Sequence, residues 1–337
     1  MTRRVGSVVY CTEQGLGRLA KSFYDNGIFT EVYIKEHHCR LNRFEWYPPG
    51  TPVVPSHSRD YSGVHRWVES LDTLLIFETP FDWNLISTAH LHGVRVVFMP
   101  MYECTPEKIP VEPDLWICPS ALDYDYFQKT NRAIYTPVPV DVPYRRRTVC
   151  RHFVHNAGNG GLRGRNGSWE VWQALQLVKK PVEFTFRIQD SELAETLTKF
   201  SPPVPGHITF HYEVGTVPYE NLWSTGDVFV FPEKFNGLSL PLQEAYASGM
   251  IVLATDRYPN NVYLPRQTLM TPTEVLHGQR VGGSYMPFTE STVNAETIAK
   301  WIDDLYDMDL SDQSDRGFWY AQKNSWNELK PRYLEIL

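Results

Sequence analysis

Short runs of apolar residues alternate with amphipathic helical patterns along the whole chain. In the first half, β-branched and aliphatic residues form five runs, each bounded by turn residues, at 5–10, 32–34, 73–77, 94–99 and 115–118. After the first run, apolar residues recur on one face of a predicted helix that opens at Gly15 and ends at Gly27. This alternation is typical of a parallel sheet with crossover helices.

The same alternation begins again after a stretch rich in proline and arginine at 136–152, which is typical of an interdomain linker. Further strands are expected at 153–156, 184–188, 208–212, 228–231 and 251–254, with helices at 169–178 and 241–248. We therefore predict an α/β protein of two doubly wound, Rossmann-like domains that face each other across a cleft. The expected boundaries are 1–145, 146–315, and a helical segment at 316–337 that packs back toward the first domain.

Composition narrows the class of protein. A chain of 337 residues with 42% hydrophobic and 21% charged residues is typical of a soluble globular protein, and its net charge of −7 argues against a general nucleic-acid coat. The five cysteines are scattered without a C-x-x-C pair, which favours reduced thiols in a cytosol and no zinc site. The apolar run at the start is too short for a signal peptide, and no stretch approaches a membrane span. We expect a cytoplasmic protein without integral membrane contact.

The chemistry of the chain is most concentrated around the predicted helix at 241–248. Pro241 suits its first turn and Gly249 its left-handed C-cap. The preceding loop should offer free amides and a positive dipole end to a diphosphate, and it consists of Asn236, Gly237, Leu238 and Ser239. Glu244, expected in the first turn, could accept hydrogen bonds from a sugar diol, or could only favour the helix N-terminus electrostatically.

The stretch around this helix resembles the family-four glycosyltransferases of the GT-B fold, which are retaining enzymes that use nucleotide sugars. The family pattern of a glycine, Val-Pro, a strand aspartate, a proline and E-G-F-G-L-P-x-x-E-A-x-A-x-G falls on Gly215, Val217, Pro218, Asp227, Pro232, Leu240, Pro241, Glu244, Ala245, Ala247 and Gly249. The resemblance implies transfer of a sugar from a nucleotide-diphosphate donor, without a cofactor and without a metal. It also implies that the leaving diphosphate helps to deprotonate the acceptor.

One of the two acids of the family motif is kept here and the other is replaced by an amide. By resemblance, Glu244 is the acid that holds the nucleotide ribose. Asn236 falls where the family has an acid that contacts the donor sugar. An amide can bridge two hydroxyls but supplies no charge. Glu233 has the charge of the missing acid, but it lies three residues before the position that the motif gives to that acid.

A second family feature is a pair of basic residues that neutralises the leaving diphosphate. Gly158 matches the family glycine, whereas Asn166 and Gly167 fall where the family has Lys-Gly. Arg163 and Arg165 stand close by, and a guanidinium can grip phosphate oxygens in a bidentate fork. The alternative is a flexible surface loop with solvated arginines.

In the first domain, the resemblance places Gly15 and Gly17 in a glycine-rich turn over the reaction centre, although a plain helix start would look the same. Met101 falls where the family has a histidine that contacts the donor sugar. The neighbouring Tyr102 and Glu103 are therefore candidates for polar or catalytic work at that strand end, or for structural roles.

The acceptor is expected on the first domain, where the irregular segment 37–67 interleaves basic and aromatic residues. The candidate contacts in it are Arg40, Arg43, Trp46 and Trp67. Such residues suit stacking on sugars as well as on bases with contacts to phosphates. A saccharide or small polar acceptor is the first interpretation, and a hydroxymethylated DNA base is the alternative. A non-catalytic nucleotide-sugar-binding protein, or an epimerase or phosphorylase of similar build, also remains open.

Overall fold

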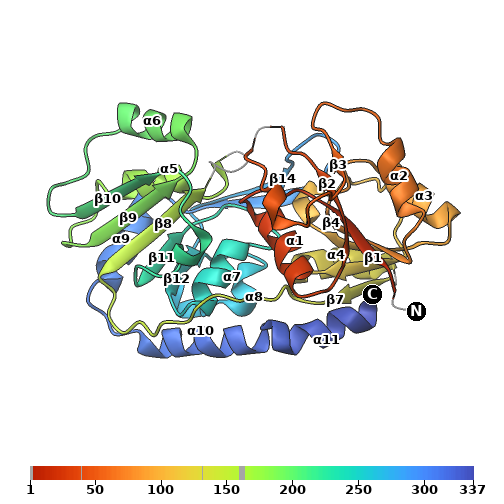
Figure 1. The fold of residues 1–337 in the computed structure, drawn as a ribbon. Helices are drawn as coiled ribbons and strands as arrows, with labels where there is room; N and C mark the ends of the chain where they lie inside the picture. The colour runs from red at the N-terminus through yellow and green to blue at the C-terminus, as the bar shows by residue number, and fades with distance from the viewer. Residues whose placement is uncertain (1–2, 39, 131, 159–163) are drawn as a thin grey trace. The chain divides into compact units, whose positions relative to one another are not determined.

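The structure is a computed structural model that describes residues 3–38, 40–130, 132–158 and 164–337. The chain forms two compact units (Figure 1). Unit 1 comprises Met1–Val138, Ser284–Met286 and Trp326–Leu337, and unit 2 comprises Pro139–Gly283 and Pro287–Ser325. The chain thus leaves unit 1 after Val138, returns to it briefly at Ser284–Met286 and again at Trp326, so its last helix belongs with the N-terminal sheet.

Unit 1 contains a parallel sheet that has seven strands in its described part, in the order β3-β2-β1-β4-β5-β6-β7. The strands are β1 Val5–Val9, β2 Glu31–Lys35, β3 Val53–Val54, β4 Thr73–Glu78, β5 Arg95–Pro100, β6 Leu115–Cys118 and β7 Ala133–Tyr135. The order reverses between β1 and β4, which are neighbours in the sheet but not in the sequence. This reversal is the switch point of a doubly wound sheet, outside which ligands usually bind.

Helices cover both faces of this sheet. One face packs against α2 Ser62–Val68, α3 Asn84–Leu91 and α4 Ala121–Phe127. The other face packs against α1 Gly15–Asp25 and α11 Trp326–Ile336. Phe23 joins these last two helices to the sheet, because its ring lies 5.3 Å from that of Phe77, 5.0 Å from Trp326 and 4.8 Å from Tyr333.

Unit 2 contains a second parallel sheet, with the order β10-β9-β8-β11-β12-β13 over the residues that the structure describes. Its strands are β8 His152–Gly158, β9 Glu183–Ile188, β10 Thr209–Val214, β11 Val228–Phe231, β12 Ile251–Thr255 and β13 Leu269–Met270. The switch point of this sheet lies between β8 and β11.

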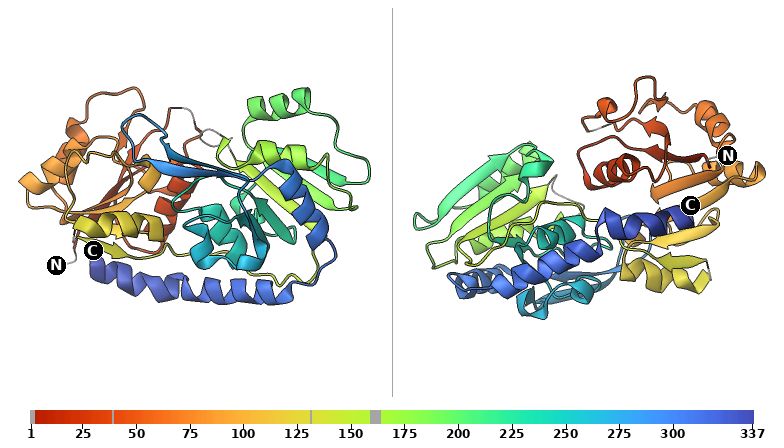
Figure 2. Two further views of the ribbon diagram at one scale, coloured as in Figure 1. Left: turned by 180° about the vertical axis from the view of Figure 1, so that it is seen from behind. Right: turned by 60° about the horizontal axis from the view of Figure 1, so that its bottom comes forward.

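The second sheet is also covered on both faces (Figures 1 and 2). One face packs against α5 Ser168–Ala174, α6 Ser191–Phe200 and α9 Ala295–Leu305. The other packs against α7 Leu240–Ala247, α8 Asn260–Tyr263 and α10 Ser311–Lys323. Strands β14 Glu274–Gln279 and β15 Phe288–Thr292 form a separate antiparallel hairpin.

The α/β class and the two Rossmann-like sheets predicted from the sequence are confirmed, and each strand expected from an apolar run is present. Within the described residues, no helix combines the length and the apolar character that crossing a lipid bilayer requires.

Candidate functional site

The loops that follow β8 and β11 meet at the switch point of unit 2. The backbone N–H of Lys234, after β11, donates to the carbonyl oxygen of Arg165, after β8, at 2.6 Å. Gly167 lies so close to Pro232 that a Cβ atom there would overlap the Pro232 carbonyl oxygen. The two loops therefore form one surface at the carboxyl edge of the sheet, where ligands of this fold bind.

Helix α7 starts from this surface. It begins at Leu240 with proline next in its first turn, and Ser239 precedes it in the left-handed conformation, with φ at +50°. Gly249, with φ at +86°, follows the helix as expected. Glu244 lies in the second turn and not in the first, because the helix starts one residue earlier than predicted. The charge of Glu244 therefore acts less on the helix N-terminus than the sequence suggested.

Asn236 changes the expected picture of this loop. Its side-chain oxygen accepts hydrogen bonds from the backbone N–H groups of Leu238 at 3.1 Å and Ser239 at 3.0 Å. These are two of the amides predicted to be free for a diphosphate, and asparagine caps them because its short side chain reaches backbone two and three residues ahead. These two amides therefore already have an acceptor within the loop.

Glu233 is not a substitute for the missing acid. Its side chain is fully buried and pairs with the guanidinium of Arg257. The same carboxylate oxygen accepts from the Ser239 hydroxyl and from Asn260 Nδ2, the latter at 3.0 Å. Arg257 also donates to the Asn236 carbonyl oxygen at 3.0 Å. This buried network holds the start of α7 and the loop before it in place.

Glu244 is half-buried on α7 and has a partner that the sequence analysis missed. The Tyr219 hydroxyl donates to Glu244 Oε1 at 2.7 Å. Tyr219 begins a short 3-10 helix, Tyr219–Asn221, directly after the Val-Pro pair of the resemblance, which was the available signal. The bond orients the Glu244 carboxylate and leaves it capacity to accept further hydrogen bonds.

The loop after β8 is described only in part. Arg163 lies outside the described residues. Arg165 is half-buried, and Gly158 and Gly167 adopt positive φ angles of 61° and 67°, which glycine tolerates best. Asn166, at the place of the family lysine, donates from Nδ2 to the Ala157 carbonyl oxygen at 2.9 Å and so ties the loop back to β8.

A lysine that sequence reasoning missed lies beside Arg165. Lys234 Nζ pairs with Glu170 Oε1 at 2.7 Å, and both side chains are largely buried. Glu170 is in the first turn of α5, so the pair links the β11 loop to the start of that helix. The position of Lys234, two residues after the Pro232 of the motif, was the signal in the sequence that could have identified it.

At the carboxyl end of β5 in unit 1, Glu103 is 2% exposed and Asp123 is fully buried. The Asp123 carboxylate accepts from the Tyr102 backbone N–H at 2.8 Å and from the Ser120 hydroxyl. Burial raises the pKa of Asp123 to about 7, with a smaller contribution from the charge of Glu103 and against the effect of these hydrogen bonds. Asp123 holds the loop after β5 through Tyr102, and Glu103 is buried in the same loop, which fits structural roles better than catalytic ones.

The raised pKa gives a prediction for stability. The folded chain keeps the Asp123 proton up to about pH 7, whereas the unfolded chain loses it near 3.8. The free energy of unfolding should therefore fall as pH rises from about 4 to about 7, by an amount on the order of a few kcal/mol. Asp123→Asn should remove this slope in thermal melts across that range. Asp125→Asn, an exposed site on the same helix, should keep it. A slope that survives in Asp123→Asn would contradict the assignment.

The glycine-rich turn after β1 has a structural reason. A Cβ atom at Gly17 would overlap the carbonyl oxygen of Thr12, so glycine is required where the loop after β1 crosses helix α1. Gly15 is the first residue of that helix. The close approach accounts for Gly17 without a ligand.

The structure brings Arg43 and Trp46 together beside the same loop. Arg43 Nε donates to Glu13 Oε1 at 3.1 Å, and Glu13 also pairs with Arg18. The Arg18 guanidinium lies 4.8 Å from the centre of the Trp46 ring. The charge of Arg43 is thus compensated and one face of Trp46 is covered. Arg40 is exposed.

Trp67 lies elsewhere. Its ring packs edge to face on Tyr33 at 5.6 Å and against Gly6, which is in the first half of β1. Ligands are expected at the carboxyl ends of the strands, so these contacts favour a packing role for Trp67, and its contact with an acceptor stays a prediction.

No protein-family model matches the sequence, and no curated protein matches it significantly. Solved structures do match over nearly the whole chain. HepE of Anabaena, in complex with UDP and glucose, superposes with a TM-score of 0.66 at 10% identity over 99% of both chains. A glycosyltransferase of Rickettsia africae gives 0.66 at 11% identity over 98% of this chain and 97% of the other. Sucrose-phosphate synthase of Thermosynechococcus elongatus gives 0.60 at 12% identity, over 99% and 98%. The chain therefore has the two-domain, Rossmann-like α/β architecture of the GT-B fold.

Proposed function

We propose that the protein is a retaining glycosyltransferase that takes its sugar from a nucleotide-diphosphate donor bound by unit 2. The observation that carries the proposal is the joined surface of the loops after β8 and β11 at the switch point, with α7 starting from it. The N-terminus of a helix at this edge of a doubly wound sheet is a favourable place for a diphosphate.

Each part of the donor has a proposed partner. Glu244, oriented by Tyr219, accepts from the ribose hydroxyls. The diphosphate binds the amides of Leu238 and Ser239, where its oxygens replace the side-chain oxygen of Asn236. The released Asn236 amide then contacts the donor sugar, and Gly237 leaves room for the phosphates.

Arg163 and Arg165 stabilise the charge that develops on the leaving diphosphate, together with the amides at the start of α7. The proposal requires neither a metal nor a cofactor. Within the described residues, no cluster of three or more histidine, cysteine and acidic side chains gathers that could hold a metal ion. Glu103 is left out of the reacting groups because it is buried.

The structural neighbours guide the choice of donor. HepE was solved with UDP, with UDP and glucose, and with UDP-glucose. Uridine diphosphate and UDP-glucose are therefore the first ligands to test. A saccharide or small polar acceptor is favoured over hydroxymethylated DNA, because the charge of Arg43 is compensated by Glu13. The protein works in the cytoplasm in this proposal.

A test of the donor site is isothermal titration of the wild type and Glu244→Gln with UDP and UDP-glucose. We expect Glu244→Gln to lower the affinity for UDP about tenfold to a hundredfold. This is the loss expected for hydrogen bonds to a charged group, roughly 1.5 to 3 kcal/mol. Glu296→Gln, at an exposed position in the first turn of α9, is the matched control and should bind UDP like the wild type.

Unchanged affinity in Glu244→Gln would remove Glu244 from the donor site.

A second candidate function is a nucleotide-sugar-binding protein without catalysis, and the capped amides at 238 and 239 give it support. Release of UDP from UDP-glucose during incubation with the wild type distinguishes the enzyme from this binding protein.

A further inference from the structure

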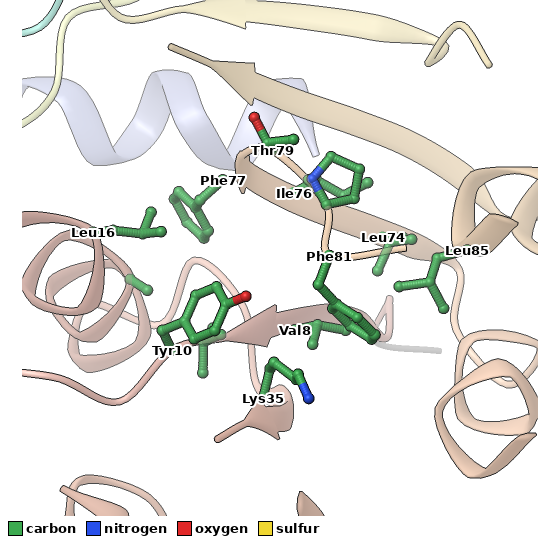
Figure 3. Close-up of a pocket in the computed structure, with 13 residues that line it drawn as sticks. Val8, Tyr10, Leu16, Lys35, Leu74, Ile76, Phe77, Thr79, Phe81 and Leu85 are labelled. Atoms are coloured by element: carbon green, nitrogen blue, oxygen red, sulfur yellow. The ribbon is translucent and has the colours of Figure 1, made fainter. Parts of the chain in front are cut away.

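A small pocket of about 30 Å³ lies at the carboxyl edge of the unit 1 sheet (Figure 3). Three neighbouring strands end at it: Tyr10 follows β1, Lys35 ends β2, and residues 79–81 follow β4. The order of the sheet reverses between β1 and β4, so the pocket lies at the switch point of unit 1. The donor site proposed above uses none of these residues.

Lys35 is a buried cation that lines this pocket. It is 7% exposed, and its Nζ donates to the Pro55 carbonyl oxygen at 2.9 Å. The ring centres of Tyr61 and Phe81 lie 5.8 and 5.7 Å from the nitrogen. An ammonium group has three N–H donors, and one carbonyl oxygen satisfies one of them. In the described part of the chain, no carboxylate forms an ion pair with Lys35.

The other buried cations of the described chain are compensated. Arg187 pairs with Glu213 at 2.7 Å, and Arg257 pairs with Glu233. Arg147 has no acid in its hydrogen-bond shell but donates to the carbonyl oxygens of Arg145, Trp223, Gly226 and Ser248. Lys35 has no acid at ion-pair distance and only one carbonyl oxygen, and the charge of the neighbouring Glu36 offsets only part of the burial that lowers the pKa of Lys35. Buried charges are normally paired, so a ligand is the expected source of its counter-ion.

Tyr10 supplies a second polar group. Its hydroxyl and the Lys35 nitrogen both turn toward the Phe81 side of the pocket (Figure 3). Burial and the negative charge of Glu78 raise the pKa of Tyr10, so the hydroxyl keeps its proton and can donate. The remaining walls are mainly apolar and include Val8, Leu74, Ile76 and Leu85.

We propose that this pocket binds a carboxylate of the sugar acceptor, with Lys35 as its counter-ion and Tyr10 as a second hydrogen-bond donor. That the ligand is a sugar acceptor rests on the proposed glycosyltransferase function. That the pocket binds a carboxylate does not depend on it. A water needs roughly 10 to 15 Å³ of such space, so the pocket holds two or three waters, about the size of a carboxylate and less than a phosphate group needs.

The test is titration of the full chain with acetate, benzoate and phenylacetate, with benzyl alcohol and inorganic phosphate as probes of charge and shape. We expect at least one of the three carboxylates to saturate, and Lys35→Met to weaken it at least about tenfold, the loss of a hydrogen bond to a charged group. Lys129→Met is the matched control, because Lys129 is exposed and lies 5.5 Å from the Tyr126 ring in the same unit. It should bind like the wild type.

Two further readouts separate a ligand site from a structural lysine. Burial lowers the pKa of Lys35, and a bound carboxylate should raise it again, which the NMR titration of the lysine Nζ detects. Lys35→Met removes an unpaired buried charge, so its melting temperature without carboxylate should not fall below that of the wild type. Tyr10→Phe keeps the ring and should weaken the same carboxylate by a smaller factor.

No saturable binding of any carboxylate, equal affinity in Lys35→Met, or tighter binding of phosphate than of carboxylates would overturn the proposal. A strong loss of stability in Lys35→Met would also overturn it, because the lysine would then be a structural group. These titrations contain no nucleotide sugar, so failure of the donor proposal appears in the Glu244→Gln titration and not here.

Discussion

Arg257→Met should destabilise unit 2 by about 3 to 5 kcal/mol, because it leaves the buried Glu233 carboxylate without its counter-ion. It also removes the hydrogen bond to the Asn236 carbonyl oxygen, so the start of α7 should loosen and UDP affinity should fall. Chemical denaturation measures the first effect and titration with UDP the second.

An exposed ion pair of the same unit provides the control. Arg151 Nε pairs with Asp307 at 2.6 Å, and the two side chains are 67% and 49% exposed. Arg151→Met should therefore leave the free energy of unfolding nearly unchanged, because water and salt screen an exposed pair. Glu233→Gln added to Arg257→Met should recover part of the loss, since no unpaired charge is then buried. Equal losses in Arg257→Met and Arg151→Met would show that the buried network does not hold the loop.

Gly167→Ala should lose more stability than Gly164→Ala. Both glycines have almost the same positive φ, 67° and 66°, so both substitutions carry the cost of an alanine at positive φ, roughly 1 to 2 kcal/mol. At Gly167 the new Cβ also overlaps Pro232, whereas no atom of the described residues lies within 4 Å of a Cβ at Gly164. The overlap should add about 1 to 3 kcal/mol and separate the loops after β8 and β11.

The difference between these two variants isolates the contact between the loops. We expect Gly167→Ala to bind UDP more weakly than Gly164→Ala, measured by titration at a temperature where both are folded. Equal stability and equal UDP affinity of the two variants would mean that the contact with Pro232 does not shape the site.

The sheets were predictable because their central strands are fully buried. Such strands appear as continuous apolar runs, as at 73–77 and 228–231. Their short length and the turn residues at both ends distinguish these runs from buried helices. The short edge strands were not predicted: β3, β7 and β13 contain two, three and two residues. Strand β3 also lies within the proline-rich segment 37–67. Their pairing is set by the neighbouring strands and not by their own sequence.

The sequence predicted on which loop and helix the motif residues of the site lie, but not the contacts that their side chains make. The motif placed Asn236 and Glu244 on the right loop and helix, but the capping of two amides by Asn236 depends on a side-chain torsion that no spacing encodes. Glu233 and Lys35 show a second limit, because the sequence does not reveal which charges find a partner inside the fold. Glu233 finds Arg257, far along the chain, and Lys35 finds only a carbonyl oxygen.

The most direct test of the central claim, that unit 2 binds a nucleotide-diphosphate sugar at the switch point between β8 and β11, is a crystal structure of the protein grown with UDP. We predict electron density with the ribose hydroxyls on Glu244 and the diphosphate at the backbone amides of Leu238 and Ser239, with the Asn236 side chain turned away from them. Density for UDP at any other place in the chain, or none at concentrations that saturate binding in solution, would contradict the account.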